Sequence, residues 1–380
     1  MQGDASHRNF SRRGPITRVG NRTWFVSGYE EARAVLCSDA IHVDVGSPRS
    51  QENGCVTSPP VADRLLMMNG SDHKRNRRVV APHLTAKSLS SLRESFVAKA
   101  DVLVNKALSA LGVEVISELA LPFSTYAVCE LAGVPEADRE MVAQWAVWAA
   151  EGIDRTTRVL DQDRVISSDS QLRHYIETNL DSFASSDIVR GLLAARETHI
   201  ISERELIGTC SMLLMGGVAT TVSLLGHSVL MLASGAPTFE ELKEDSSLNS
   251  AWIDDLVRLS SPVQTGVRRV VKAPIEIRDC QLEAGDEVIV LFGPANRDDR
   301  VFSNNDCVAL GKRPIRHLGF GAGPHSCIGA SLARMEVAIF VGAILNGVDR
   351  IDVIEEPTFV NSRAIRSISK LTVRLFAEQA

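Results

Sequence analysis

The stretch from His317 to Glu336, HLGFGAGPHSCIGASLARME, constrains the fold of this chain most strongly. Three glycines in its first half remove side chains, so the backbone there can turn sharply and approach a flat ligand closely. Apolar residues then recur at the spacing of a buried helix face, namely Ile328, Leu332, Met335 and Ile339. Cys327 therefore stands at the N-terminus of a predicted helix, where free N–H groups and the helix dipole favour a thiolate. A thiolate on such a loop is suited to be the single protein ligand of a metal ion.

This stretch resembles the haem-binding loop of the cytochrome P-450 family, Phe-Gly-x-Gly-x-His-x-Cys-x-Gly. The fixed positions are filled by Phe320, Gly321, Gly323, His325, Cys327 and Gly329. The resemblance implies that Cys327 ligates the iron of haem b and that Phe320, Gly321, Gly329 and His325 contact the cofactor. The alternative is a buried structural cysteine beside a flexible turn, which is the usual role of a lone cysteine. The number of matched positions makes that alternative remote.

Composition and charge narrow the class of protein. The chain has 380 residues, of which 44% are hydrophobic and 23% charged, as in an ordinary soluble globular protein. A formal net charge of −6 argues against general nucleic-acid binding. The 7 cysteines are scattered and form no CxxC pair, so neither a disulfide framework nor a zinc site is indicated. We therefore expect a cytoplasmic protein.

Two segments bear on membrane association. Residues 1–20 are predicted to be a loose N-terminal tail that carries neither a signal peptide nor a membrane anchor, and residues 21–380 to form a single domain. Residues 210–235 are apolar enough to suggest a membrane span, but Thr220, Thr221, His227 and several glycines interrupt them. A helix that is apolar all round in a protein of this size more often crosses the core. We therefore expect no membrane span.

The segment NGSDHKRNRRVVAPHLT, residues 69–85, predicts a short basic helix capped by a serine or an aspartate. Such a run of charged residues usually forms a solvent-exposed helix face. The segment also resembles the His-x-x-x-Arg helix that binds the haem propionates in the P-450 family. The resemblance implies that His73 and Arg77 bind propionates, whereas Arg75, Arg78 and Lys87 stay on the surface.

A long helix is predicted from Ser202, which forms a capping box with Glu205. Its centre, residues 216–221, reads GGVATT and resembles the oxygen-binding groove of the family, in which the threonine follows an acid. On that match Gly217 and Thr220 are the catalytic positions. Position 219 is alanine, so protons would have to arrive by another route, through water from the cavity mouth or from an acidic group on the substrate.

The walls of the substrate cavity are predicted from several segments that lie far apart in the sequence. The run SSPVQTGVRRVV, residues 260–271, passes the substrate side in the family, and Arg269 matches a third propionate-binding residue. Residues 38–69 carry no periodicity and are predicted to be a long loop over the cavity. The predicted substrate-contacting residues are Leu213, Gly216, Val218, Thr265, Val267 and, at the tip of a C-terminal hairpin, Ile365.

A scaffolding ion pair departs from the family pattern. The Glu-x-x-Arg signature is here Asp255 to Arg258, which is one methylene shorter. Its third partner, normally an arginine, aligns with Cys307. We expect a remodelled network in which Arg297 or Arg313 substitutes.

The resemblance runs from about residue 24 to residue 375 and implies a mainly α fold, with a large helical part, a small β-rich lobe, and haem between the long central helix and the helix that follows the cysteine loop. It implies a monooxygenase that oxidises a small organic molecule of specialised metabolism. Electrons would come from a separate ferredoxin and ferredoxin reductase, docked on a basic surface that includes Arg316.

Two alternatives stay open. The first is a haem–thiolate peroxygenase, or a coupling or nitrating enzyme, because Ala219 replaces the acid of the usual relay. The second is a catalytically silent relative that recruits a partner. Asp255 and Cys307 keep the second alternative open, whereas the intact Cys327, Gly217 and Thr220 argue against it.

Overall fold

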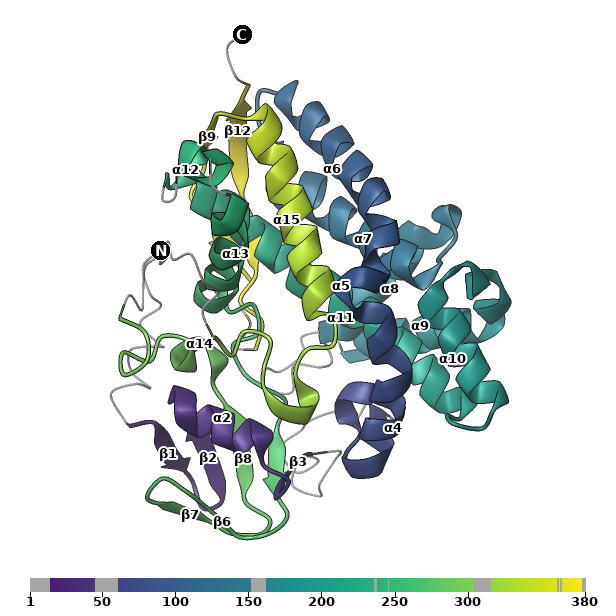
Figure 1. Ribbon diagram of the computed structural model, residues 1–380, viewed down its shortest axis with the longest axis vertical. Helices are drawn as coiled ribbons and strands as arrows, with labels where there is room; N and C mark the ends of the chain where they lie inside the picture. Colours follow the sequence, from purple (N-terminus) through teal and green to yellow (C-terminus); the bar gives the residue numbers. More distant parts are fainter. Residues whose placement is uncertain are drawn as a thin grey trace.

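The computed structural model describes residues 14–44, 61–151, 162–235, 238–244, 246–303, 316–360, 362 and 364–377. A large helical part lies beside a smaller lobe built around a β-sheet (Figure 1). The predicted mainly α fold with a small β-rich lobe is therefore confirmed. The proposed limits of the single domain, 21–380, stay a prediction.

The helical part is assembled from amphipathic and fully buried helices around one large apolar core. Its helices are α4 (Gly70–Val80), α5 (Ala86–Leu89), α6 (Arg93–Leu108), α7 (Leu121–Ala132), α8 (Arg139–Glu151), α9 (Gln162–Asn179), α10 (Asp187–Glu197), α11 (Glu203–Ala233), α12 (Phe239–Glu244), α13 (Ser246–Ser260) and α15 (Ala330–Gly347). A π-helical turn, Val115–Ala120, leads directly into α7.

The central helix α11 begins where the sequence predicts. The hydroxyl of Ser202 accepts a hydrogen bond from the Glu205 N–H, and the Glu205 carboxylate accepts one from the Ser202 N–H, which is a complete capping box. The helix packs against α7, α8, α13 and α15, and Figure 1 shows it passing behind α15. Its partners on several sides explain why an all-round apolar sequence is stable here.

Within the described residues, three helical stretches are long and apolar enough to cross a membrane when judged by length and composition alone: Val115–Ala132, Glu203–Ala233 and Ala330–Gly347. In this fold, between 50% and 67% of an apolar 18-residue window in each stretch is buried inside the molecule. The α11 stretch is thus a core helix of the described fold, as expected from its interrupting polar residues.

The lobe has a five-stranded sheet with the order β1–β2–β8–β5–β3. Its strands are β1 (Ile16–Val19), β2 (Thr23–Val26), β3 (Ile41–Val43), β5 (Arg269–Val271) and β8 (Glu287–Val290). Only the β2–β8 pair is parallel. Helix α2 (Tyr29–Cys37) covers the sheet and shares a second apolar core with it (Figure 1).

The remaining strands form small sheets at the edges. A hairpin of β6 (Ile275–Ile277) and β7 (Cys280–Leu282) extends the lobe, and the short helix α14 (Phe292–Ala295) follows β8. Near the C-terminus, β12 (Thr372–Phe376) pairs with β4 (Val113–Glu114) and β9 (Arg350–Val353), while β10 (Thr358–Phe359) pairs with β11 (Ile368–Lys370). The C-terminal hairpin is therefore present as expected.

Two sequence predictions about loops need correction. Residues 16–19, placed in the loose tail, form β1 because they pair antiparallel with β2. The loop predicted over residues 38–69 contains β3 and two short 3₁₀ turns at Val61–Asp63 and Leu65–Met67, while residues 45–60 lie outside the described part.

The Asp255–Arg258 pair is buried at the C-terminal end of α13. The Arg258 Nε donates to the Asp255 carboxylate, and both side chains are at most 1% exposed. The guanidinium also donates through Nη1 to the Asn296 carbonyl at 3.1 Å and lies 4.9 Å from the ring centroid of Phe302. The shorter aspartate therefore still forms the expected ion pair with its arginine.

Arg297 is hydrogen-bonded next to this pair, at the end of α13. Its guanidinium donates to the backbone carbonyls of Leu259 and Gly293, which ties α14 to the end of α13. Cys307 and Arg313 lie outside the described residues. The predicted substitution by Arg297 or Arg313 stays a prediction.

We expect Asp255→Ala to destabilise the fold strongly. The change leaves a buried guanidinium without its carboxylate, and breaking one partner of a buried pair costs about 3–5 kcal/mol. The measurement is the free energy of unfolding in urea. Asp187→Ala is the matched control, because Asp187 pairs with Arg190 at the same spacing but both side chains are more than half exposed. That control should cost no more than about 1 kcal/mol, and equal effects of the two changes would contradict the assignment.

Candidate active site

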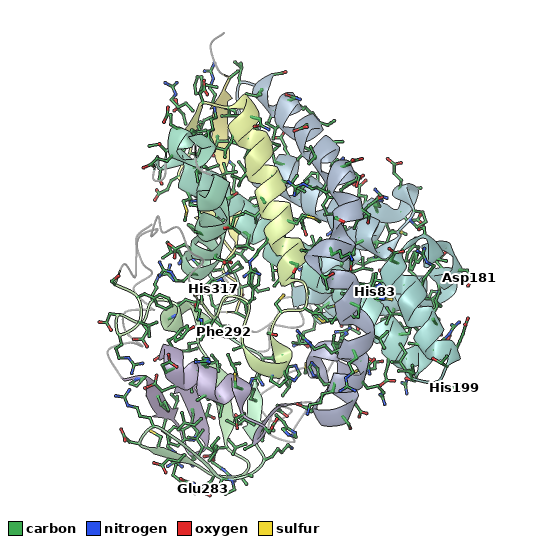
Figure 2. The ribbon with its side chains drawn as sticks, viewed as in Figure 1. His83, Asp181, His199, Glu283, Phe292 and His317 are labelled. Atoms are coloured by element: carbon green, nitrogen blue, oxygen red, sulfur yellow. The ribbon has the colours of Figure 1, made fainter. Side chains whose placement is uncertain are left out.

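One cavity of about 360 Å³ opens between α11, α15 and the lobe. Its wall is formed by residues of α4, α11, the loop before α15, the segment before β5 and the C-terminal hairpin. Figure 2 places two labelled residues, Phe292 and His317, in this central region between the lobe and α15, and Phe292 lines the cavity. Most lining side chains are apolar, including Leu65, Leu131, Met212, Leu213, Phe292 and Ile365.

The cysteine loop is held in place by backbone hydrogen bonds. The Cys327 N–H donates to the Phe320 carbonyl at 2.7 Å, and the Gly321 N–H donates to the Leu318 carbonyl at 2.9 Å. Gly323 adopts a φ of +68°, and a Cβ atom there would lie 2.3 Å from the Leu36 carbonyl oxygen of α2. The loop therefore needs glycine at position 323, both for its left-handed conformation and for its close approach to α2.

Cys327 precedes α15 by three residues, and its accessible side chain lines the cavity. Burial raises the pKa of its thiol, whereas the Gly329 N–H and the charges of Arg77 and Arg334 oppose the rise. In the protein alone, the surrounding protein atoms thus disfavour the thiolate that the sequence predicts, although the side chain remains accessible from the cavity. A bound metal ion would reverse this balance, because coordination deprotonates a thiol.

Four basic side chains from three separate segments meet at the cavity wall: His73, Arg77, Arg269 and His325. The His73 and His325 ring centroids lie 4.1 Å apart, and Arg77 Nη2 donates to the Ser326 hydroxyl at 3.2 Å. Arg269 is only 7% exposed, and no carboxylate among the described residues pairs with it. The structure therefore brings the predicted propionate-binding residues together.

Burial lowers the pKa values of this group, and neighbouring bases lower those of the two histidines further. Burial lowers the pKa of Arg269 to about 10. Burial and then the neighbouring His73 lower the pKa of His325 to about 3, and burial followed by Arg77 lowers the pKa of His73. Buried cations are normally paired, so this cluster suits an anionic ligand. A haem would place its thiolate ligand and its two propionates where Cys327 and these bases lie, so the residues fit the cofactor.

The distal wall comes from α11. The Thr220 hydroxyl donates to the Gly216 carbonyl at 2.8 Å, and Thr220, Gly216 and Gly217 all line the cavity. A Cβ atom on Gly217 would lie 2.2 Å from Val128 of α7, so this glycine permits close helix packing as well. The catalytic role of Gly217 and Thr220 stays a prediction.

The predicted substrate-contacting residues divide into two groups. Five of them lie in the cavity wall: Leu213, Gly216, Thr265, Val267 and Ile365. Ile365 is held there by a β-bridge to Val263. The prediction for Val218 was wrong, because its side chain is fully buried in the helical core and does not line the cavity. A helix turns by 100° per residue, so alternate positions of one run cannot all face a ligand.

The basic side chains predicted on the surface are accessible. Arg78, Lys87 and Arg316 are exposed, as expected. The Arg75 side chain is 39% exposed, and its Nη2 also donates to the Glu205 carboxylate that caps α11. Arg75 therefore lies at the surface and also ties α4 to α11.

Sequence reasoning missed Asp254, which supports the cysteine loop. Its Oδ1 accepts a hydrogen bond from Arg334 Nε at 2.7 Å and lies 3.4 Å from His317 Nε2. The Arg334 guanidinium in turn lies 4.5 Å from the ring centroid of Phe320. The only sequence signal for Asp254 is that it precedes Asp255. A sequence cannot show that one of two adjacent acids stabilises the end of α13 and the other the cysteine loop.

A family model and two curated relatives show which known proteins this chain resembles. A family model described as "Cytochrome P450" matches residues 166–348. The chain is 30% identical to the "Biotin biosynthesis cytochrome P450" of Bacillus subtilis (strain 168), over 85% of this chain and 82% of that protein. It is 29% identical to the "Mycinamicin VIII C21 methyl hydroxylase" of Micromonospora griseorubida, over 90% and 87% of the two chains.

Solved structures show the same fold over nearly the whole length. The crystal structure of P450BioI in complex with an acyl carrier protein ligated to hexadec-9Z-enoic acid superposes with a TM-score of 0.88 at 26% identity, covering 98% of both chains. Epothilone B-bound cytochrome P450epoK has a TM-score of 0.90 at 24% identity and covers 98% of this chain and 96% of its own, which shows the fold alone. The chain therefore belongs to the cytochrome P450 family and is a haem-dependent oxidoreductase of the monooxygenase class.

Proposed function

We propose that this enzyme holds haem b and uses dioxygen to oxidise an apolar small molecule of specialised metabolism in the cytoplasm. The observation that carries the proposal is the cavity itself, with a thiol and a cluster of unpaired bases in one wall and mainly apolar side chains elsewhere. An apolar wall favours a substrate of similar character, because burial removes the apolar surface of both from water.

The haem supplies oxygen activation when it is bound, and the chain supplies its environment. Cys327 would ligate the iron, while His73, Arg77, Arg269 and His325 would bind the propionates by charge-assisted hydrogen bonds. The apolar side chains of α11 and the C-terminal hairpin would orient the substrate and exclude water. Thr220 would hold a polar atom over the cofactor by its hydroxyl.

We propose a ferredoxin and its reductase as the source of electrons. The exposed side chains of Arg78, Lys87 and Arg316 would provide a basic docking surface. An acidic ferredoxin suits such a surface, since complementary charge mainly accelerates association. Docking there should therefore weaken with salt.

A second candidate is a peroxygenase, or a coupling or nitrating enzyme. Ala219 favours it, because the methyl group lies in the cavity wall where the family usually carries an acid. Such enzymes would bypass the ordinary delivery of protons during dioxygen activation. The two candidates differ in the source of the oxygen atom, which can be measured.

The test supplies hexadec-9Z-enoic acid, free or bound to acyl carrier protein, and a macrolide lactone as probes. We expect at least one to change the haem absorbance on titration and to gain one oxygen atom from ¹⁸O₂ when NADPH, ferredoxin and reductase are present. Ferredoxin without probe is the control for background oxygen consumption. Product that forms only with hydrogen peroxide, or that contains no oxygen from ¹⁸O₂, would favour the second candidate.

A further inference from the structure

The cavity wall carries an arginine that the haem-binding cluster does not use. Arg268 lines the cavity next to Arg269, and its side chain is 14% exposed. Arg269 is the first residue of β5, and successive residues of an extended chain point to opposite faces. Arg268 accordingly contacts Glu287 of β8, whereas Arg269 lines the cavity with the propionate-binding group. Arg268 is therefore a separate cation on the lobe side of the cavity.

One carboxylate holds Arg268, and the contact is loose. Arg268 Nη1 donates to Glu287 Oε1 at 3.4 Å, which is longer than a usual N–H···O bond. The same carboxylate also accepts a hydrogen bond from the Thr23 hydroxyl at 3.2 Å. Among the described residues, no other group accepts a hydrogen bond from the Arg268 side chain. Glu287 does not line the cavity, so the guanidinium keeps N–H donors that can bind a group inside it.

A second unpaired donor lies three residues earlier in the same wall. Thr265 lines the cavity, and its Oγ1 is buried without a hydrogen-bond partner among the described residues. A β-bridge to Leu291 holds its backbone in place. Buried hydroxyl groups are normally hydrogen-bonded. The run from Thr265 to Arg268 thus presents a hydroxyl and a cation that a ligand with polar oxygen atoms would satisfy.

The wall around this run is apolar. Val263, Val267 and Ile289 line it from the lobe, and Ile365 lines it from the C-terminal hairpin. An ionised carboxylate enters such surroundings only at a high cost in free energy unless a cation pairs with it, whereas an alcohol of the same length bears a much smaller cost. A preference for an acid over the matching alcohol therefore depends on a cation in the wall, and Arg268 is the one that the propionates leave available.

We propose that Arg268 binds the carboxylate of an apolar organic acid, with Thr265 as a second donor, and that the enzyme thereby selects acidic substrates. Glu287 orients the guanidinium from outside the cavity. The arginine fork matches the two oxygen atoms of a carboxylate, so one end of the molecule is fixed while its apolar part lies along the wall. This inference rests on the proposed oxidation of an apolar small molecule and names the group that anchors it.

The test measures binding to the holoenzyme by calorimetry at about pH 8, where carboxylic acids are ionised, and without any electron donor. The probes are decanoic acid with decan-1-ol, and hexadec-9Z-enoic acid with hexadec-9Z-en-1-ol. A charge-assisted hydrogen bond changes affinity by about 10-fold or more, so we expect the wild type to bind at least one acid about 10-fold more tightly than its alcohol. Arg268→Gln should remove this preference, while Arg268→Lys, which keeps the charge, should keep part of it.

Glu287→Gln separates a binding role of Arg268 from a structural one. If Arg268 only stabilised the lobe by pairing with Glu287, changing either residue would have the same effect. We instead expect Glu287→Gln to bind the acid at least as tightly as the wild type, because it removes a competing carboxylate and keeps the cation. Arg22→Gln is the matched control, since Arg22 pairs with Asp286 at 3.0 Å in the same lobe but does not line the cavity. It should leave the acid preference unchanged.

The proposal would be overturned if neither wild-type pair showed an acid preference, or if the preference survived in Arg268→Gln. A loss in Glu287→Gln as large as in Arg268→Gln would also overturn it. Decyl phosphate identifies the anion, because tighter binding than decanoic acid that likewise depends on Arg268 would overturn the choice of a carboxylate. Failure of the proposed function is recognised separately, because oxygen-18 would then be missing from the product while the acid preference remains.

Discussion

Replacing Cys327 with alanine is expected to abolish the absorption of the reduced carbon monoxide complex that is typical of thiolate ligation. Alanine has no donor atom, and Cys327 is the only cysteine among the described residues that line the cavity. We therefore expect the complete loss of this band and of ferredoxin-supported activity. The measurement is a difference spectrum of dithionite-reduced protein with and without carbon monoxide.

Cys280→Ala is the control for that experiment, because Cys280 lies in the β6–β7 hairpin and does not line the cavity. The control should retain the full band. If Cys327→Ala kept the band, another thiol would be the ligand, and Cys307 would be the first to change. The alignment of the cysteine loop would then be wrong.

The Arg77→Ala, Arg269→Ala double variant is expected to lose haem while the apoprotein remains folded. Each charge-assisted bond to a shielded propionate should contribute about 1.5–3 kcal/mol. Together they should change haem affinity by roughly 10²- to 10⁴-fold. Burial lowers the pKa of both arginines, which means that their charges cost the apoprotein stability. Their removal should therefore not unfold it.

Haem content per protein and urea unfolding of the apoprotein together check this expectation. Arg268→Ala is the matched control, because the neighbouring Arg268 also lines the cavity but its Nη1 already lies 3.4 Å from the Glu287 carboxylate. It should retain haem. Full haem retention in the double variant would refute the role of Arg77 and Arg269.

The sequence predicted those features that depend on local pattern. The glycine loop, the capping box at Ser202 and the apolar periodicity of α15 each act within a few residues, so their structures follow from the chain itself. The resemblance to the P-450 family pointed to His73, Arg77, Arg269 and His325, which the fold brings to one cavity wall.

Other features depend on contacts between distant segments, which no single-chain pattern shows. Val218 was placed in the cavity because its neighbours line it, yet the helix turns it into the core. Arg75 stays at the surface as expected, but its ion pair with Glu205, 130 residues later, could not be foreseen. The pKa of Cys327 was expected to fall at a helix N-terminus, but the protein atoms that the fold packs around the sulfur raise it.

The Glu336 carboxyl illustrates the same limit. In the sequence it is one more acid in a helix, at an i+9 position from Cys327. Only packing of α7 and α11 against α15 shows that it is fully buried, faces the cavity and lies beside Ser124. A one-dimensional pattern cannot distinguish such a group from a solvated glutamate.

The most direct test of this account is the carbon monoxide difference spectrum of the purified, reduced wild-type protein. Because a thiolate donates electron density to the iron, we predict the red-shifted band that gives the family its name, in proportion to the haem content. Absence of carbon monoxide binding would contradict a haem enzyme at this site. A band at the shorter wavelength typical of a neutral axial ligand would contradict ligation by the Cys327 thiolate.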